Sequence, residues 1–286
     1  MGGSSRGFVF RYSVVSPVTA SEELAHLRRA QGAHVVGVFA GFWDEPSGGT
    51  PGGVLLMELG TISMQHFCHQ HGRLDLRMAR RFALELCTGV GFLHERCILH
   101  RDLAPKNVLL CPDGADFTLK ICDLGACIRI RPSIASRSRE HPSVKPLAER
   151  LCTVPYASPE MLAGLPVGPP TDVWSAAIIT WEWFSDDPCQ IIGPDVALDP
   201  GNVMTPQCAK AAWKILRGLA FESMPLQEGA GGTRAALLAV LTRAREDPEL
   251  RPGALALRGA LENSATGAPA SGEDPTRESC PNHSQS

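Results

Sequence analysis

The sequence predicts a chain of class α+β in which short strands come first and long helices follow. Residues 35–42 and 54–57 are rich in branched and aromatic or other large apolar side chains, which is typical of strands. Residues 76–96 carry apolar side chains at the spacing of one helix face. Residues 174–184 are mainly apolar, which predicts a buried helix. A small β-rich part should therefore precede a larger helical part.

The remaining segments follow the same logic. Residues 20–30 are polar with apolar positions at helical spacing, so we expect a helix there. The Gly- and Pro-rich residues 44–53 predict a loop. Residues 108–110 and 117–121 predict two strands around a turn at Pro-Asp-Gly. From residue 263 to 286 large apolar side chains are nearly absent, which predicts a disordered tail.

Composition excludes several classes of function. The chain has 286 residues, 44% of them hydrophobic, enough for one or two cores. Its net charge of −3 gives no reason to expect a nucleic-acid partner. The 10 cysteines are scattered without a C-x-x-C pair, which favours a reducing compartment, the cytoplasm or nucleus. No apolar run reaches the roughly 20 residues that span a bilayer, so we expect no membrane partner.

Two linked motifs carry the chemistry. The run from His100 to Asn107 reads His-Arg-Asp-Leu-Ala-Pro-Lys-Asn, and Asp123-Leu124-Gly125 follows it. The first resembles the catalytic loop H-R-D-L-x-x-x-N of eukaryotic-type protein kinases, and the second resembles their D-F-G. The resemblance implies a bilobal protein-kinase-like fold with ATP and Mg²⁺ between the lobes. It also implies a reduced N-lobe and hinge at residues 1–60 and a mainly helical C-lobe at residues 61–262.

The resemblance assigns roles to the loop residues. Asp102 would orient the substrate hydroxyl, while Asn107 and Asp123 would supply the oxygen ligands that magnesium prefers. Lys106 would be a counter-charge for the transferring phosphate, although most serine/threonine kinases carry their lysine two residues after the aspartate. Arg101 would pair with a phosphate on the basic, serine-rich segment 126–150 and order it.

Further matches extend through the lower lobe. Residues 153–160 resemble the end of an activation segment, with Ser-Pro-Glu in place of A-P-E. Glu160 then needs a buried cationic partner, for which we expect Arg251. Asp172 opens an apolar helix, and in the family this carboxylate braces the catalytic-loop backbone; it could also be a plain first-turn helix acid.

The nucleotide pocket is predicted from the resemblance as well. Glu58 to Gly60 would be the hinge whose backbone groups bind adenine, and Met57 would guard the inner pocket. Leu109 would lie under the adenine ring. Glu23 stands where the helix glutamate of the family pairs with the ATP-anchoring lysine, but it could equally be a solvated glutamate in the first turn of a helix.

The largest departure from the family is the upper-lobe lysine, because no lysine precedes Lys106. One alternative is that residues 2–9 are a shortened glycine-rich loop. Another is that residues 8–11 are the remnant of the third strand, with Arg11 at the lysine position. Arginine is bulkier than lysine and always charged. A degenerate or truncated upper lobe is the third possibility.

Three functions follow. The first is transfer of the ATP γ-phosphate to a serine or threonine hydroxyl of a protein substrate, which Thr153 and Tyr156 favour. The second is a pseudokinase or truncated isoform acting as a scaffold or regulator, which the missing lysine favours. The third is a tyrosine-specific or small-molecule kinase; the Leu-Ala sequence after Asp102 and the basic residue before Asn107 resemble tyrosine kinases. The oligomeric state is left open.

Overall fold

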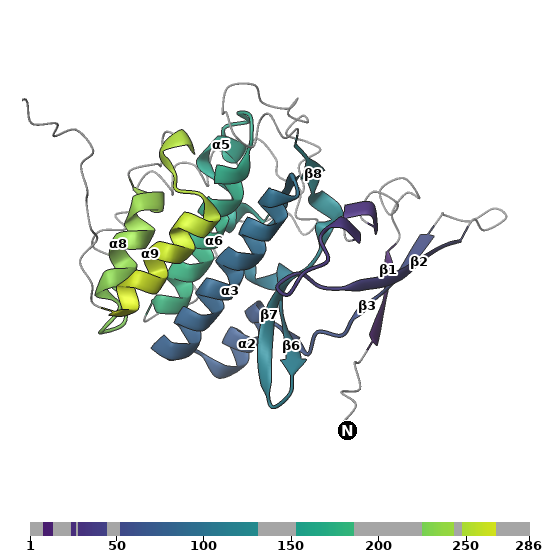
Figure 1. Ribbon diagram of the computed structural model, residues 1–286, viewed down its shortest axis with the longest axis horizontal. Coiled ribbons are helices and arrows are strands. Elements are labelled where there is room, and N and C mark those ends of the chain that lie inside the picture. Colours follow the sequence, from purple (N-terminus) through teal and green to yellow (C-terminus); the bar gives the residue numbers. More distant parts are fainter. Residues whose placement is uncertain are drawn as a thin grey trace, which may run out of the picture.

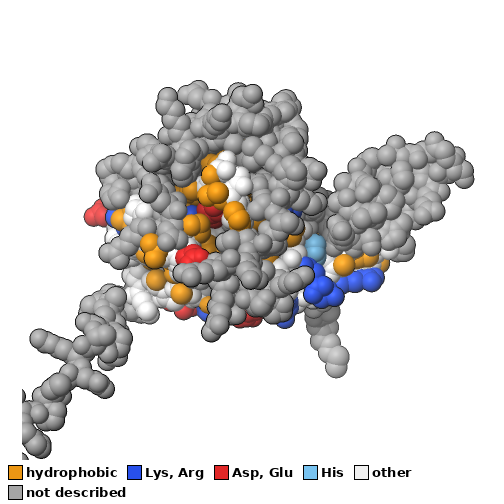
Figure 2. All heavy atoms as spheres, turned by 90° about the horizontal axis from the view of Figure 1, so that it is seen from above, with side chains coloured by type: hydrophobic (Ala, Val, Ile, Leu, Met, Phe, Trp, Pro, Cys, Tyr) orange, Lys and Arg blue, Asp and Glu red, His pale blue; other side chains and the backbone are white. Residues whose placement is uncertain are grey.

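The computed structural model describes residues 8–13, 24–26, 28–44, 52–130, 153–185, 225–242 and 248–266. A sheet-rich part and a larger helical part lie side by side, joined near the end of strand β3 (Figure 1). The α+β class and the two-part arrangement with the strands first are confirmed. Seen from above, Lys and Arg side chains gather next to the sheet-rich part, and hydrophobic side chains gather mainly over the helical part (Figure 2).

The sheet-rich part is a three-stranded antiparallel sheet in the order β1-β3-β2. Its strands are β1 (Phe8–Ser13), β2 (Val38–Asp44) and β3 (Gly52–Glu58). In β3, the buried Leu55 and Met57 alternate with less buried neighbours, as expected for a strand with one face on a core. The predicted helix at 20–30 is described in part, with residues 24–26 and 28–29 helical.

Strand β2 begins later than the predicted residue 35. Val35 instead forms an isolated bridge with Ile121, and the Val36 amide donates to the Ile121 carbonyl at 2.9 Å. Residues 35 and 36 are therefore held by a strand of the helical part, which the local sequence pattern does not reveal. This exchange ties the two parts of the molecule together.

Two small sheets carry the loops of the helical part. One has the order β4-β6-β7, with β4 (Ile62–Ser63), β6 (Val108–Asp113) and β7 (Asp116–Ile121). The other pairs β5 (Ile98–Leu99) with β8 (Ile128–Arg129). The predicted strands at 108–110 and 117–121 are present but longer, because the turn is tight and Gly114 adopts a φ of 64°.

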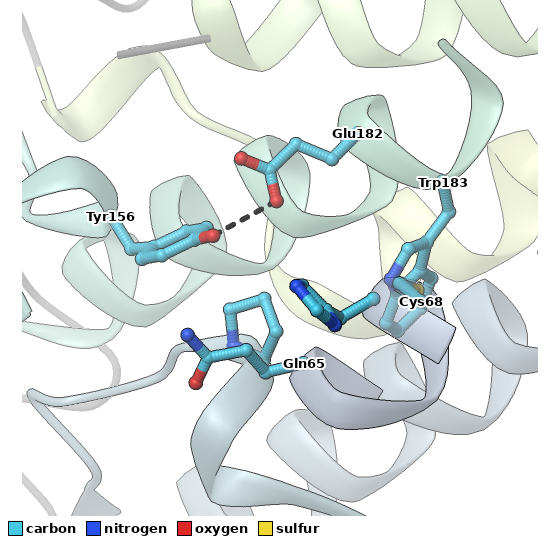
Figure 3. A pocket seen from close by; sticks show the side chains of 7 residues that line it. Gln65, Cys68, Tyr156, Glu182 and Trp183 are labelled. Atoms are coloured by element: carbon cyan, nitrogen blue, oxygen red, sulfur yellow. Dashed lines mark hydrogen bonds between the residues drawn. The ribbon is translucent and has the colours of Figure 1, made fainter. Parts of the chain in front are cut away.

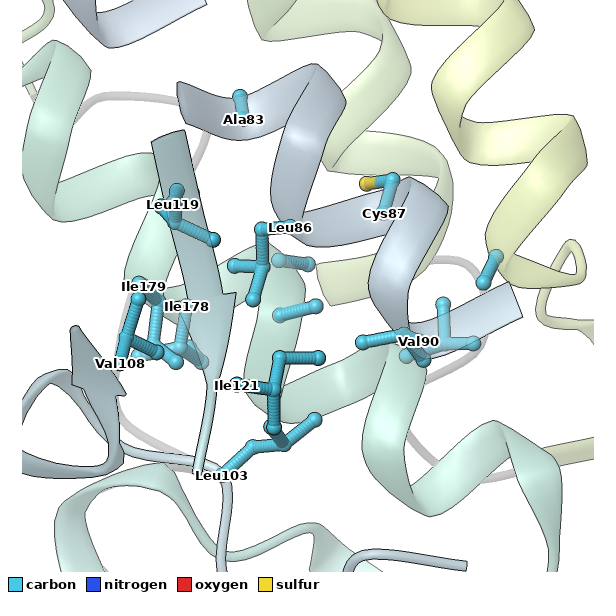
Figure 4. Packing of buried hydrophobic residues seen from close by; sticks show 14 of the residues in the cluster. Ala83, Leu86, Cys87, Val90, Leu103, Val108, Leu119, Ile121, Ile178 and Ile179 are labelled. Atoms are coloured by element: carbon cyan, nitrogen blue, oxygen red, sulfur yellow. The ribbon is translucent and has the colours of Figure 1, made fainter. Parts of the chain in front are cut away.

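The helices form one core around α3 (Leu76–Glu95) and α6 (Pro169–Phe184). The Asp75 carboxylate caps α3 by accepting from the Met78 amide at 2.8 Å. Apolar side chains from α3, β7 and α6 interlock in Figure 4, among them Leu86, Leu119 and Ile178. Further α-helices in the described part of the chain are α2 (Met64–His71), α5 (Pro159–Leu162), α8 (Gly231–Leu241) and α9 (Ala254–Thr266).

Helix α9 runs past residue 262, where the tail was predicted to begin. Ser264 donates to the Leu261 carbonyl at 2.7 Å and lies 3.3 Å from the Thr233 hydroxyl of α8. Polar residues thus extend the helix because a neighbouring helix provides partners. Residues 267–286 lie outside the described part. Within the described residues, no helix is both long and apolar enough to cross a membrane.

Candidate active site

The catalytic loop, residues 100–107, connects β5 to β6 and is held from below by helix α6. Arg101 has a φ of 67°, a left-handed conformation that costs a non-glycine residue free energy. The surroundings stabilise it: the amides of His100 and Arg101 each donate to the Asp172 carboxylate at 2.9 Å. The expectation that Asp172 braces this loop is confirmed.

Asp172 is almost completely buried, with 1% of its surface exposed. Burial by itself raises the pKa of its carboxyl. The hydrogen bond from His94, at 2.9 Å, the electrostatic effect of His94 and His100, and the hydrogen bond from the His100 amide outweigh that effect, so the pKa lies below its ordinary value. The carboxylate is therefore kept ionised where it must accept two loop amides.

The side chain of Asp102 is held by three residues. Its Oδ1 accepts from the Thr153 amide at 2.6 Å and from the Thr153 hydroxyl at 2.7 Å. Its Oδ2 accepts from Asn107 Nδ2 at 3.0 Å and lies 3.6 Å from Lys106 Nζ. The structure thus brings Asp102, Lys106 and Asn107 together, and adds Thr153, which lies 51 residues after Asp102 in the sequence.

Asp123 lies two residues after the end of β7, with a φ of 62°. The preceding residue, Cys122, joins it to the catalytic loop: its amide donates to the Asn107 carbonyl at 2.9 Å, and its carbonyl lies 3.0 Å from His100 Nε2. Two non-glycine residues with positive φ, Arg101 and Asp123, therefore meet at this site. Strained backbone of this kind often marks a functional site.

The donor set fits magnesium. Asn107 Nδ2 is engaged by the Asp102 carbonyl at 2.7 Å and by its carboxylate, which leaves the amide oxygen for a metal. Asp123 adds a carboxylate. Among the described residues no group of three or more His, Cys, Asp or Glu could enclose a metal ion. Magnesium usually takes one or two carboxylates and completes its shell with water and phosphate oxygens, which is the kind of donor set that Asn107 and Asp123 offer.

The side chain of Arg101 points to the start of the segment that follows Asp123. Its Nε donates to the Ala126 carbonyl at 2.7 Å, and its second terminal nitrogen contacts the same oxygen. Residues 131–150, which include the serines proposed as phosphate carriers, lie outside the described part. The pairing of Arg101 with a phosphate stays a prediction.

The predicted ion pair between Glu160 and Arg251 is confirmed. The two guanidinium nitrogens bind the two carboxylate oxygens at 2.7 and 2.8 Å, and the Arg251 side chain is 0% exposed. The Thr171 hydroxyl also donates to Glu160, at 2.8 Å. This bidentate pair fastens α5 to the chain between η5 (Pro248–Leu250) and α9.

The predicted hinge, residues 58–60, begins at the last residue of β3. Met57 is buried, and Leu109 packs so closely on Gly60 that a Cβ at Gly60 would lie 2.7 Å from a Leu109 methyl. The structure therefore brings Met57, the hinge and Leu109 to one place. The carboxylate of Glu58 is engaged by Gly37 and Lys120. The roles of Met57, the hinge and Leu109 in binding adenine stay predictions.

The upper-lobe alternatives are described only in part. Residues 8–11 form a strand, and the register of β1 with β3 places Arg11 opposite Leu55. A strand is what the remnant-strand alternative expects for residues 8–11, but the place of Arg11 relative to a nucleotide stays a prediction. Residues 2–7 of the proposed glycine-rich loop and Glu23 lie outside the described residues.

A cavity of ≈ 170 Å³ opens beside the catalytic loop, between α2 and α6. Figure 3 shows Gln65 and Cys68 of α2 on one side and Tyr156 and Glu182 on the other. The Tyr156 hydroxyl donates to Glu182 Oε2 at 3.0 Å. Burial raises the pKa of the Glu182 carboxyl to about 8, and the hydrogen bond from Tyr156 opposes this only in part.

The comparisons with known proteins agree with this geometry. The family described as protein kinase domain matches residues 13–193. This chain belongs to the protein kinase family. Membership implies in general terms a transferase that uses ATP and a divalent metal. The match begins at Ser13 and so does not extend to Arg11 or to residues 2–9.

Individual kinases resemble parts of the chain. It is 32% identical over 162 residues to the serine/threonine-protein kinase mos of Xenopus laevis, covering 56% of this chain and 44% of that protein. It is 34% identical to the serine/threonine-protein kinase ATG1b of Arabidopsis thaliana, covering 43% of this chain and 16% of that protein. Calcium/calmodulin-dependent protein kinase type IV of Mus musculus is 36% identical, covering 39% and 22%. The chain thus spans less than half the length of each of these relatives.

Several site residues of this kinase-family member escaped sequence reasoning. His94 supports Asp172, Glu182 lines the cavity, and Lys120 binds Glu58 at the hinge. Each belongs to a helix or strand far in sequence from its partner. The one local signal is Glu182 itself, a charged residue in the mainly apolar half of a helix, which predicts a buried partner.

Proposed function

We propose that the chain is a serine/threonine protein kinase that transfers the γ-phosphate of MgATP to a hydroxyl of a protein substrate. The observation that carries the proposal is the pair of hydrogen bonds from Thr153 to Asp102, at 2.6 and 2.7 Å. They couple the segment predicted to position the peptide to the residue predicted to orient its hydroxyl. The serine/threonine kinases among the relatives support the same specificity.

The residues of the site divide the work. Asp102 accepts the proton of the substrate hydroxyl and aims its oxygen in line with the phosphorus. Lys106, 3.6 Å from that carboxylate, faces the negative charge that develops on the transferring group. Asn107 and Asp123 would hold Mg²⁺, which when bound neutralises phosphate charge. The hinge backbone at residues 58–60 and the side chains of Met57 and Leu109 would hold the adenine.

Arg11 is proposed as the substitute for the upper-lobe lysine, with Glu23 as its partner. Its place opposite Leu55, in the strand next to the hinge strand, supports this assignment. We further propose domain limits of 1–60 for the reduced N-lobe and hinge and about 61–262 for the C-lobe. We also propose a cytoplasmic or nuclear location, because the 10 cysteines of the sequence are scattered without a C-x-x-C pair.

The test is magnesium-dependent phosphorylation of a mixed serine, threonine and tyrosine peptide library by the purified chain. Asp102→Asn and Asp123→Asn serve as inactive controls, and the phosphorylated residue is identified by mass spectrometry. We expect phosphoserine or phosphothreonine that both substitutions abolish. Phosphotyrosine as the main product would refute the specificity.

A second candidate is a scaffold or regulator with a kinase fold. The observation that favours it is the absence of a lysine before Lys106, since nucleotide positioning supplies most of the rate in this reaction. Failure to bind MgATP at millimolar concentration would decide for this function.

A further inference from the structure

One carboxylate joins three segments where the sheet meets the helical part. Glu58 Oε1 accepts from Lys120 Nζ at 2.5 Å, and Oε2 accepts from the Gly37 amide at 3.1 Å. The Glu58 amide donates back to the Gly37 carbonyl at 2.8 Å. Glu58 thus binds Gly37 through both its backbone and its side chain, and Lys120 neutralises the negative charge of the Glu58 carboxylate.

The ion pair is well shielded from water. The Lys120 and Glu58 side chains are 16% and 24% exposed. Surface ion pairs contribute little because solvent screens them, whereas a pair with most of its surface covered is screened much less. Removing one partner would leave the other charge in a partly desolvated place, so the pair resists opening.

We call the contacts of Glu58 with Gly37 and Lys120 the clamp. Both Gly37 and Lys120 belong to segments that connect to other parts of the site. Lys120 lies in β7, which leads directly to Asp123. Gly37 continues from residues 34–36, and these are bound to the same strand: Ile121 donates to His34 and accepts from Val36, both at 2.9 Å. Hinge, residues 34–37 and β7 therefore form a closed ring of contacts.

This ring lies where the proposed adenine-binding backbone begins. Residues 58–60 can bind adenine only if their amides and carbonyls face the nucleotide in a fixed direction. The chain lacks a lysine in its upper part that could contribute to nucleotide positioning in the family's usual way. The contacts of Glu58 with Gly37 and Lys120 hold the first residue of the hinge in one orientation.

We propose that Glu58 and Lys120 are a positioning pair that sets the hinge for nucleotide binding, with Lys120 as a determinant of MgATP affinity although it lies behind the hinge. The proposal rests on the proposed function, because it concerns the same nucleotide site. It assigns to Lys120 no contact with the nucleotide.

The experiment measures the Kd of MgATP by calorimetry and KM and kcat by peptide phosphorylation, for the full chain and for Lys120→Met. Lys120→Arg keeps the positive charge. Arg258→Met is the matched control, because it removes a cation from an i,i+4 pair with Glu262 on α9, away from the hinge. Glu58→Gln is a second variant that can still accept from Gly37 but lacks the charge.

We expect Lys120→Met to raise the Kd and KM of MgATP about tenfold, because small misplacement of binding groups has effects of this size. The value of kcat should change little, Lys120→Arg should restore most of the affinity, and Arg258→Met should bind like the parent. Glu58→Gln should also raise the Kd of MgATP. This second variant allows the proposal to be tested even if Lys120→Met does not fold.

Two results separate the possible failures. If the parent chain binds MgATP and both Lys120→Met and Glu58→Gln bind it with unchanged or lower Kd, the positioning role is wrong while the proposed function stands. A lower thermal midpoint with unchanged Kd would likewise overturn the positioning role, because the pair would then stabilise the fold alone. If the parent chain itself does not bind MgATP, the proposed function fails and this inference fails with it.

Discussion

At the scale of single residues, the site depends on short polar contacts between segments distant in sequence. Asp102 illustrates this, because its carboxylate is shared among Thr153, Asn107 and Lys106. A carboxylate with several donors keeps one orientation, which is what in-line transfer to a hydroxyl requires. The sequence provides the aspartate, and the fold fixes the direction in which the Asp102 carboxylate points.

Thr153→Val should lower kcat for peptide phosphorylation about 10- to 100-fold, because a hydrogen bond to a charged group contributes about 1.5–3 kcal/mol. The shape of the side chain is retained, and the amide hydrogen bond to Asp102 remains. Thr153→Ser, which keeps the hydroxyl, is the control and should retain most of the activity. Equal kcat for the Val variant and the parent would remove Thr153 from the mechanism.

Glu182 should make stability depend on pH. The pKa of Glu182 in the folded state is about 8, above the ordinary value of 4.5. Between pH 4.5 and pH 8 the folded state therefore keeps a proton on this carboxyl that the unfolded state has lost. Stability from this group is therefore fully present below pH 4.5 and falls as pH rises towards 8. Glu182→Gln can still accept from Tyr156 and should not show this loss.

The measurement is the thermal midpoint of parent and Glu182→Gln between pH 5 and pH 9. The difference between the two proteins should shift in favour of the Gln variant as pH rises, by at most about 1.4 kcal/mol per pH unit. Groups common to both proteins cancel in the comparison. A difference that is constant across the range would show that Glu182 titrates normally.

At the scale of elements, a cap and a buried ion pair help to fasten a short helix whose apolar side chains pack into the core. Helix α5 is only four residues long, too short to be stable by itself. It is held by the Ser158 cap and by the pair of Glu160 with Arg251. Such a pair adds modest net stability compared with an apolar contact, but losing one partner leaves a buried charge.

Arg251→Met should therefore lower the free energy of unfolding by about 3–5 kcal/mol, the usual cost of breaking a buried pair. The double variant Glu160→Gln with Arg251→Met should recover part of this loss, since no charge then remains unpaired. Denaturant unfolding of the three proteins checks the prediction. If the single and double variants were equally unstable, desolvation of Glu160 would not be the cause.

At the scale of the whole molecule, the proposed function requires a nucleotide to be held between a small sheet and a large helical part. The three-stranded sheet offers a limited surface, and the proposed function places Arg11 on its strand β1. Arginine presents a planar fork where lysine presents a point charge, so the two are not equivalent. Activity then depends on whether other contacts of this chain with the nucleotide make up for the replacement of lysine by Arg11.

Arg11→Ala should raise the Kd of MgATP about tenfold or more without changing the thermal midpoint, because a charged hydrogen bond to phosphate would be lost from an edge strand. Arg11→Lys should retain part of the affinity. Calorimetric titration of the three proteins is the measurement. Unchanged affinity in Arg11→Ala would leave residues 2–9 or a degenerate upper lobe as the alternatives.

The sequence by itself determined the family, the catalytic motif and two structural contacts, those of Asp172 and of Glu160 with Arg251. These depend on residue types at short, characteristic spacings, and a buried charge demands a partner that a motif can name. Only the tertiary structure decided the start of β2, the end of α9, the cavity beside Glu182 and the clamp of Glu58 on Gly37 and Lys120. Each of these depends on contacts between segments that are distant in sequence. A local sequence pattern does not indicate which distant segment will lie next to a given residue in the folded chain.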